Sequence, residues 1–216
     1  MAVAIAAWDL AEFSGGRFEL GLGTQIKQNI VDRYSTPWTA PVRRMREYIE
    51  SLRAIFDVFQ NGGKLHYVGE NYQFTRMQPF FNPGPIEHPE IPIIMGAVGP
   101  LMTQLAGKAA DGMVAHPTNT DPQFLEDVCL PTLQKGAAKV GRQLDDFKLT
   151  LGVLLATGKT EADVAAEREK QRNMLGFLYS TPAYWPSLEL HGWGDKGPQL
   201  QRMTRESDWA GMAEVV

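Results

Sequence analysis

The residues with the clearest capacity for chemistry form a glycine-bearing corner at positions 96–102. The apolar run Ile91–Met95 before it is too short for a helix and predicts a buried strand of a parallel sheet. Gly96 and Gly99 allow a sharp turn and a close approach of the backbone to a ligand. Pro100 suits the first position of a helix, because its missing N–H costs nothing there.

The start of this predicted helix is a candidate phosphate site. With Gly99 as the N-cap, the backbone N–H groups of Leu101 and Met102 point outward at the positive end of the helix dipole. Such an arrangement suits a phosphate. An ordinary strand-to-helix turn would use the same residues, since two glycines at this spacing are a weak signal. Both interpretations remain open at this point.

Histidine and cysteine give no metal-binding pattern. His66, His88, His116 and His191 lie far apart in sequence and lack a spacing such as His-Glu-x-x-His, so no metal site is expected. His116 ends a predicted strand, where a site-lining and a structural role are equally compatible with the sequence. The single cysteine, Cys129, lies between two apolar residues and is expected to be a buried, unreactive thiol.

Composition narrows the class of protein. A chain of 216 residues with 44% hydrophobic and 21% charged residues is ordinary for one folded domain, predicted here over residues 1–216. A net charge of −4 without a run of Lys or Arg gives no reason to expect nucleic acid. No apolar stretch reaches the about 20 residues that a membrane span needs. We therefore expect a cytoplasmic protein that has neither nucleic acid nor a membrane as a partner.

Helices and strands alternate along the chain. Apolar periodicity and capping residues predict helices at 2–13, 41–59, 122–140 and 161–179, a hairpin at 65–68 and 72–74, and principal strands near 18–22, 92–96, 112–116 and 148–156. Strands separated by helices indicate βαβ units and a parallel sheet. The alternatives are a (β/α)₈ barrel, of which four strands are half, and an open doubly wound sheet. Asp111 and Gly112 are interpreted as a structural turn into a strand.

Several segments resemble the luciferase-like flavin monooxygenases and their relatives that depend on the deazaflavin coenzyme F420. They occur in order over nearly the whole chain: Ser14–Arg17, Phe18–Gln25, Pro41–Tyr48, Tyr67–Phe74, Pro92–Pro100 and Leu105–Gly112. The resemblance is strongest to the F420-dependent branch. It implies a partial TIM-like barrel that corresponds approximately to strands 4 to 7, a chain truncated at both ends, and a ligand site at the carboxyl ends of the strands.

The resemblance also implies where the cofactor binds. Gly23, Thr24 and Gln25 would lie beside the ring or ribityl chain, and the four residues of the corner would surround the phosphate. With the two helix amides, the predicted cofactor-binding residues are Gly23, Thr24, Gln25, Gly96, Ala97, Val98, Gly99, Leu101 and Met102. Asn29 is either a further hydrogen-bonding partner of the cofactor or a turn former. No catalytic residue is assigned.

The implied activity is F420-dependent hydride transfer to a small organic substrate. An FMN-dependent monooxygenase and a non-catalytic half-barrel remain alternatives, and turnover by this polypeptide alone is not expected. Half a barrel would leave two sheet edges unpaired and the interior faces of Leu20, Ile94, Val114 and Val153 uncovered. Because exposed edges and apolar patches promote association, we predict a homo-oligomer.

Overall fold

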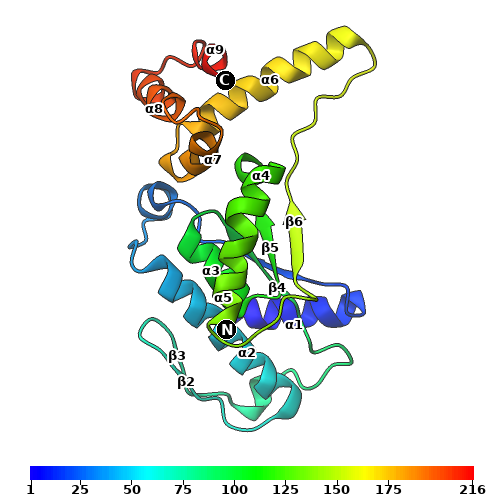
Figure 1. The fold of residues 1–216 in the computed structure, drawn as a ribbon. Helices are drawn as coiled ribbons and strands as arrows, with labels where there is room; N and C mark the ends of the chain where they lie inside the picture. The colour runs from blue at the N-terminus through cyan, green and yellow to red at the C-terminus, as the bar shows by residue number, and fades with distance from the viewer. The chain divides into compact units, whose positions relative to one another are not determined.

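A computed structural model describes all residues, 1–216 (Figure 1). Its strands are β1 (Leu20–Leu22), β2 (Tyr67–Val68), β3 (Gln73–Phe74), β4 (Ile93–Ala97), β5 (Gly112–Ala115) and β6 (Lys148–Leu151). Its α-helices are α1 (Ala2–Ser14), α2 (Pro41–Asn61), α3 (Pro100–Ala109), α4 (Pro122–Phe124), α5 (Leu130–Ala138), α6 (Glu161–Tyr179), α7 (Trp185–Leu190), α8 (Lys196–Glu206) and α9 (Met212–Val215). Short π- or 3₁₀-helical turns are η1 (Asn29–Arg33), η2 (Pro79–Phe81), η3 (Pro117–Asn119), η4 (Leu125–Cys129) and η5 (Pro182–Tyr184).

The chain divides into two compact units. The first comprises Met1–Ala97, Leu101–Met113 and Thr132–Leu149, and the second comprises Val98–Pro100, Val114–Pro131 and Thr150–Val216. In the second unit, α6 to α9 pack on one another around Leu200, Met212 and Val215 (Figure 1). The prediction of a single domain over 1–216 stays a prediction.

The four predicted principal strands are all present and form one sheet in the order β1-β4-β5-β6. β1 pairs with β4 in parallel, with Leu20 opposite Ile93, Gly21 opposite Ile94 and Leu22 opposite Met95. Because side chains alternate between the two faces of a strand, Leu20, Ile93 and Met95 lie on one face and Gly21 and Ile94 on the other. The parallel α/β class predicted from the sequence is confirmed.

This register corrects the predicted barrel-interior surface. Leu20 and Ile94 were expected to share an uncovered face, but they lie on opposite faces and are 9% and 6% exposed. Val114 and Val153 are exposed as expected, at 42% and 66%. The face of β1 opposite Leu20 therefore carries glycine rather than a row of large apolar side chains.

β6 ends earlier than the predicted strand 148–156. The N–H of Gly152 still reaches the carbonyl of Ala115, at 3.4 Å, but Pro117 has no N–H to continue the ladder. The hydroxyl of Thr120 instead donates to the carbonyl of Gly152, at 2.9 Å. The residues after Leu151 are consequently outside the sheet.

The apolar periodicity of residues 2–13 predicts a buried stripe of Val3, Ala6, Ala7, Leu10 and Phe13, but α1 uses a different face. Its buried residues are Ala4, Ala7, Trp8 and Ala11, whereas Phe13 is 83% exposed. The indole of Trp8 stacks on Phe56 and meets the edge of Phe59, both from α2, and its N–H donates to the carbonyl of Gly84. A large aromatic ring, packed on two rings of α2 and with its N–H satisfied, lies on the contact face.

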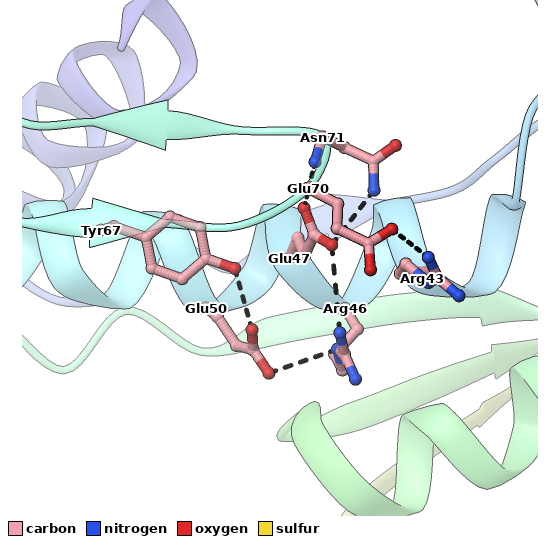
Figure 2. Close-up of polar contacts among 7 residues, drawn as sticks. All are labelled: Arg43, Arg46, Glu47, Glu50, Tyr67, Glu70 and Asn71. Carbon is pink, nitrogen blue, oxygen red and sulfur yellow. Dashed lines mark hydrogen bonds and ion pairs between the residues drawn. The ribbon is translucent and has the colours of Figure 1, made fainter.

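The periodicity of α2 predicts that its charged residues Arg43, Arg46, Glu47, Glu50 and Arg53 face water, but the fold buries Glu47, with 2% of the residue exposed. It accepts hydrogen bonds from the backbone N–H and the side-chain amide of Asn71, at 2.7 and 3.1 Å, in the loop between β2 and β3 (Figure 2). Burial alone would raise the pKa of Glu47, but these bonds and backbone N–H groups of Tyr72 and Glu70 hold it below its ordinary value. A buried carboxylate therefore fixes the hairpin on α2.

Two glycines let α3 and α5 approach closely. A Cβ atom on Gly107 would lie 2.1 Å from the carbonyl oxygen of Leu133, and one on Gly136 would lie 2.0 Å from that of Gln104. Asp111, between α3 and β5, connects α2 to the start of β4, because its carboxylate accepts hydrogen bonds from Arg53 and from the backbone N–H of Ile93. Asp111 is thus structural, as predicted.

Gly136→Ala is expected to lower the free energy of unfolding by about 1–3 kcal/mol, because the new methyl group would force the two helix backbones apart. Chemical denaturation followed by circular dichroism measures the loss. The control is Gly21→Ala, whose added Cβ would meet nothing within 4 Å and should cause no loss. Equal stabilities of the two variants would contradict close packing at this contact.

Glu47→Gln should destabilise the chain more at neutral pH than in acid. The unfolded carboxyl has the ordinary pKa of 4.5 and the folded one is lower, so its stabilisation is present above 4.5 and is lost as the pH falls through the folded pKa. The thermal midpoints of both proteins across pH measure the difference. Glu50→Gln, which removes an exposed carboxylate of the same helix, should have a smaller effect. A pH-independent difference for Glu47→Gln would contradict this assignment.

Self-association is expected from the second unit's extended segment, in which Leu151, Val153 and Leu155 are 40%, 66% and 69% exposed. Light scattering at micromolar concentration should detect dimers or larger species. The double substitution Val153→Lys with Leu155→Lys should reduce them, since charge on an exposed extended segment opposes its pairing with another chain. A monodisperse monomer before any substitution would overturn the expectation.

Candidate functional site

Three glycines form an open strip of backbone at the carboxyl ends of β1 and β4. Gly21 lies opposite Ile94, and continuing the same register places Gly23 opposite Gly96, on the same face. A Cβ on Gly21 or Gly23 would meet nothing within 4 Å, and one on Gly96 would approach only the carbonyl of Leu22, at 3.7 Å. We call Gly21, Gly23 and Gly96 the glycine floor. Neither packing nor a positive φ requires glycine at these positions, so the free surface suits a flat ligand laid against the backbone.

The corner after β4 has the predicted order of strand, glycine-bearing turn and helix. Pro100 is the first residue of α3, and the following Leu101 is 64% exposed. Gly99 has no positive φ, and a Cβ there would meet nothing within 4 Å. A larger residue would therefore fill space without straining the turn. Ala97, in contrast, is 5% exposed, so its side chain belongs to the core.

A cavity of about 230 Å³ lies next to the glycine floor, within the first unit. Gly23 and Thr24, two of the three residues predicted at the end of β1, line it. The other residues of its wall come from the end of β1, from the loop before α2, from α2 and from the hairpin: Leu22, Ile30, Thr36, Pro37, Trp38, Thr39, Pro41, Arg44, Met45, Tyr48 and Tyr72. We call this cavity the aromatic pocket.

Gln25 does not line the pocket. It has a left-handed backbone (φ 58°), and its side-chain carbonyl accepts a bond of 3.0 Å from the amide of Asn29, which begins η1. Gln25 and Asn29, which the sequence analysis both offered as cofactor contacts, thus bond to each other at an exposed turn.

Aromatic rings and one guanidinium shape the pocket. The rings of Tyr48 and Tyr72 are 5.4 Å apart, and the guanidinium of Arg44 lies 6.0 Å from the centre of the Tyr72 ring. Burial raises the pKa of the Tyr48 hydroxyl and the neighbouring Tyr72 adds to the rise, so Tyr48 stays a neutral hydrogen-bonding group at physiological pH. The Glu47 contact described above places Tyr72, since it fixes the preceding residue, Asn71.

Left-handed backbone conformations gather in the loop that precedes α2. Of the four non-glycine residues with a positive φ, Gln25, Ser35 and Ala40 all lie between β1 and α2. Such conformations cost of order 1–3 kcal/mol each and cluster where a fold is shaped for function. Besides Gly23 and Thr24, this loop supplies five residues of the pocket wall: Ile30, Thr36, Pro37, Trp38 and Thr39.

The residues that the sequence did not single out are Trp38, Arg44, Tyr48 and Tyr72. Tyr48 shares the apolar stripe of α2, and its periodicity predicts a core residue. Arg44 and Tyr72 come from different elements, and only the hairpin's position brings them together.

The remaining candidates have structural roles. The ring of His116 stacks on that of Tyr184, with centroids 4.5 Å apart, and its Nδ1 bonds to the hydroxyl of Thr118, at 2.9 Å. Burial lowers the pKa of His116, which keeps the ring neutral. Cys129 is 5% exposed and burial raises the pKa of its thiol, as an unreactive cysteine requires. No group of three metal-ligating side chains occurs, and none of the helices is long and apolar enough to cross a membrane.

Comparison with known proteins extends over the whole chain. The sequence model of the luciferase-like monooxygenase family matches residues 1–216. An uncharacterised protein of Mycobacterium tuberculosis is 42% identical over 216 residues, which are 100% of this chain and 63% of that protein. A 5,10-methylenetetrahydromethanopterin reductase of Archaeoglobus fulgidus is 31% identical over 220 residues, 99% of this chain and 60% of the reductase. The chain thus spans less than two thirds of the length of these relatives.

The fold has a solved counterpart. The coenzyme F420 dependent tetrahydromethanopterin reductase from Methanopyrus kandleri superimposes with a TM-score of 0.74 over 99% of this chain and 62% of the reductase, at 24% identity. This likeness confirms the α/β fold with a parallel sheet, of that reductase's TIM-barrel type, which the sequence predicted. Because the family's sequence model matches residues 1–216, the chain belongs to the luciferase-like monooxygenase family.

Proposed function

We propose that this protein is an F420-dependent oxidoreductase that moves a hydride between the deazaflavin and a small organic substrate. Relatives named for F420-dependent activity support the cofactor, among them the F420-dependent glucose-6-phosphate dehydrogenase of Nakamurella multipartita, which is 28% identical over 188 residues. Within the chain, the glycine floor beside the aromatic pocket is the observation that carries the proposal.

The floor fits a planar ring. Side chains at Gly21, Gly23 and Gly96 would occupy the space in which such a ring could lie against the backbone. The corner from Gly96 to Met102 would hold the phosphate through backbone N–H groups at the start of α3, where the helix dipole favours an anion. When bound, the cofactor supplies the hydride chemistry, and the protein supplies binding and orientation.

The aromatic pocket would hold the substrate. Gly23 belongs both to the floor and to the pocket wall, so a ring on the floor and a molecule in the pocket would be neighbours. Tyr48 offers a neutral hydroxyl within the wall, and the rings of Trp38 and Tyr72 exclude water from the substrate's apolar part. Holding two reactants side by side is the main contribution that such a surface makes to rate.

Gly99→Val and Gly23→Val should each weaken F420 binding tenfold or more, because the added side chain blocks the approach of the cofactor to the backbone. The fold should survive, since both positions have open space and no positive φ. Quenching of F420 fluorescence measures the affinity, with FMN titrated in parallel and Ala138→Val, on the exposed face of α5, as the matched control.

The outcomes separate the alternatives. Tighter binding of FMN than of F420 would favour the flavin monooxygenase over the proposed function. Unchanged affinity of both variants for both cofactors would remove the corner and the floor as their site. Failure of the unsubstituted chain to bind either cofactor would contradict the proposed function.

A further inference from the structure

Arg44 differs from the other arginines of α2 in its surroundings. Arg43 pairs with Glu70, Arg46 lies within 4 Å of Glu47 and Glu50, and Arg53 pairs with Asp111 at 3.0 Å. Arg44 alone has no carboxylate within 4 Å. Its guanidinium donates one bond to the protein, from Nη1 to the carbonyl of Pro37 at 3.3 Å, so most of its five N–H donors are uncommitted.

The guanidinium of Arg44 lies at the aromatic pocket. Arg44 is half-buried, lies near the face of Tyr72 and forms part of the pocket wall. No acidic residue lines the pocket, and its other side-chain polar groups are the hydroxyls of threonines and tyrosines and the indole N–H of Trp38. The pocket therefore has one positive charge and no negative charge to balance it.

The start of α2 adds to this positive potential. Pro41, the first residue of the 21-residue helix, lines the pocket, and no side chain caps the helix at Ala40. The positive end of the helix dipole and the Arg44 guanidinium are thus on the same cavity. Arginine also presents a planar fork that matches the two oxygens of a carboxylate or phosphate.

We propose that the aromatic pocket recognises a small planar molecule that carries a carboxylate or phosphate group, with Arg44 binding the anion and Tyr48, Tyr72 and Trp38 contacting the planar part. As a statement about the substrate, this rests on the proposed function. The volume of about 230 Å³ is below the roughly 300–1,000 Å³ of pockets for drug-sized ligands, so a small acid fits and a whole cofactor does not.

Benzoate and phenyl phosphate are suitable probes, with benzamide as the neutral counterpart of benzoate. Saturation-transfer NMR titrations should show that either or both anions bind at least tenfold more tightly than benzamide. Arg44→Gln should weaken anion binding about tenfold, since a charge-assisted bond is lost, and should leave benzamide binding unchanged. Arg44→Lys should retain part of the affinity, because it keeps the charge without the planar fork.

The matched control is Arg43→Gln, which removes the same charge from the adjacent residue. Arg43 pairs with Glu70 on the surface (Figure 2). It does not line the pocket, so this variant should bind the probes like the unsubstituted chain. Equal binding of benzoate, phenyl phosphate and benzamide would overturn the proposal. So would anion binding that Arg44→Gln leaves unchanged or that Arg43→Gln weakens equally.

Fluorescence titration of the same variants with F420 distinguishes the two proposals. We expect Arg44→Gln to leave F420 affinity unchanged, because the cofactor is assigned to the glycine floor and the corner. A tenfold loss of F420 affinity with no effect on the probes would assign Arg44 to the cofactor and overturn the inference. Anion binding that depends on Arg44 in a chain that does not bind F420 would support the anion pocket and contradict the proposed function.

Discussion

The parallel register between β1 and β4 is the constraint on which the rest of the first unit depends. It places Leu20 beside Ile93 and Leu22 beside Met95, facing the core, and aligns Gly21 and Gly23 with Ile94 and Gly96 on the opposite face. Since the side-chain period of a strand is two, a slip of one residue would turn the glycines into the core and the leucines out of it. Core formation and an open glycine surface are thus two results of one pairing.

A second fixed point lies on α2. This helix buries an apolar stripe against the core and, through the carboxylate of Glu47, also holds the β2–β3 hairpin (Figure 2). A buried carboxylate is stable only when hydrogen bonds replace its lost hydration, and the hairpin loop provides them. The hairpin in turn brings Tyr72 to Tyr48 and Arg44, which belong to the start of the same helix. One helix therefore supports the core and part of the pocket wall.

The features that the chain shares with its family and the residues that form the pocket lie in different parts of the chain. Pairing of β1 with β4 and the glycine-bearing corner are features of the fold, and their likeness to an F420-dependent reductase extends over nearly the whole chain. The pocket wall comes largely from the loop before α2, where three residues have left-handed backbones. In proteins of this type, loops at the carboxyl ends of strands carry the differences in ligand, because they can vary without disturbing the sheet.

Sequence alone determined the parallel α/β class, the alternation of elements, the capped helix 161–179, the family and the glycine corner, because each depends on local periodicity, turn chemistry or contiguous motifs. It did not determine which faces meet. The alignment of Leu20 with Ile93, the burial of Glu47 and the use of Trp8 in place of the predicted stripe of α1 follow from partners distant in the chain. The pocket belongs to this second group: Gly23 and Thr24 were predicted, whereas Arg44, Tyr48 and Tyr72 become neighbours only when a buried carboxylate fixes the hairpin on α2, since nothing in their local sequence records that contact.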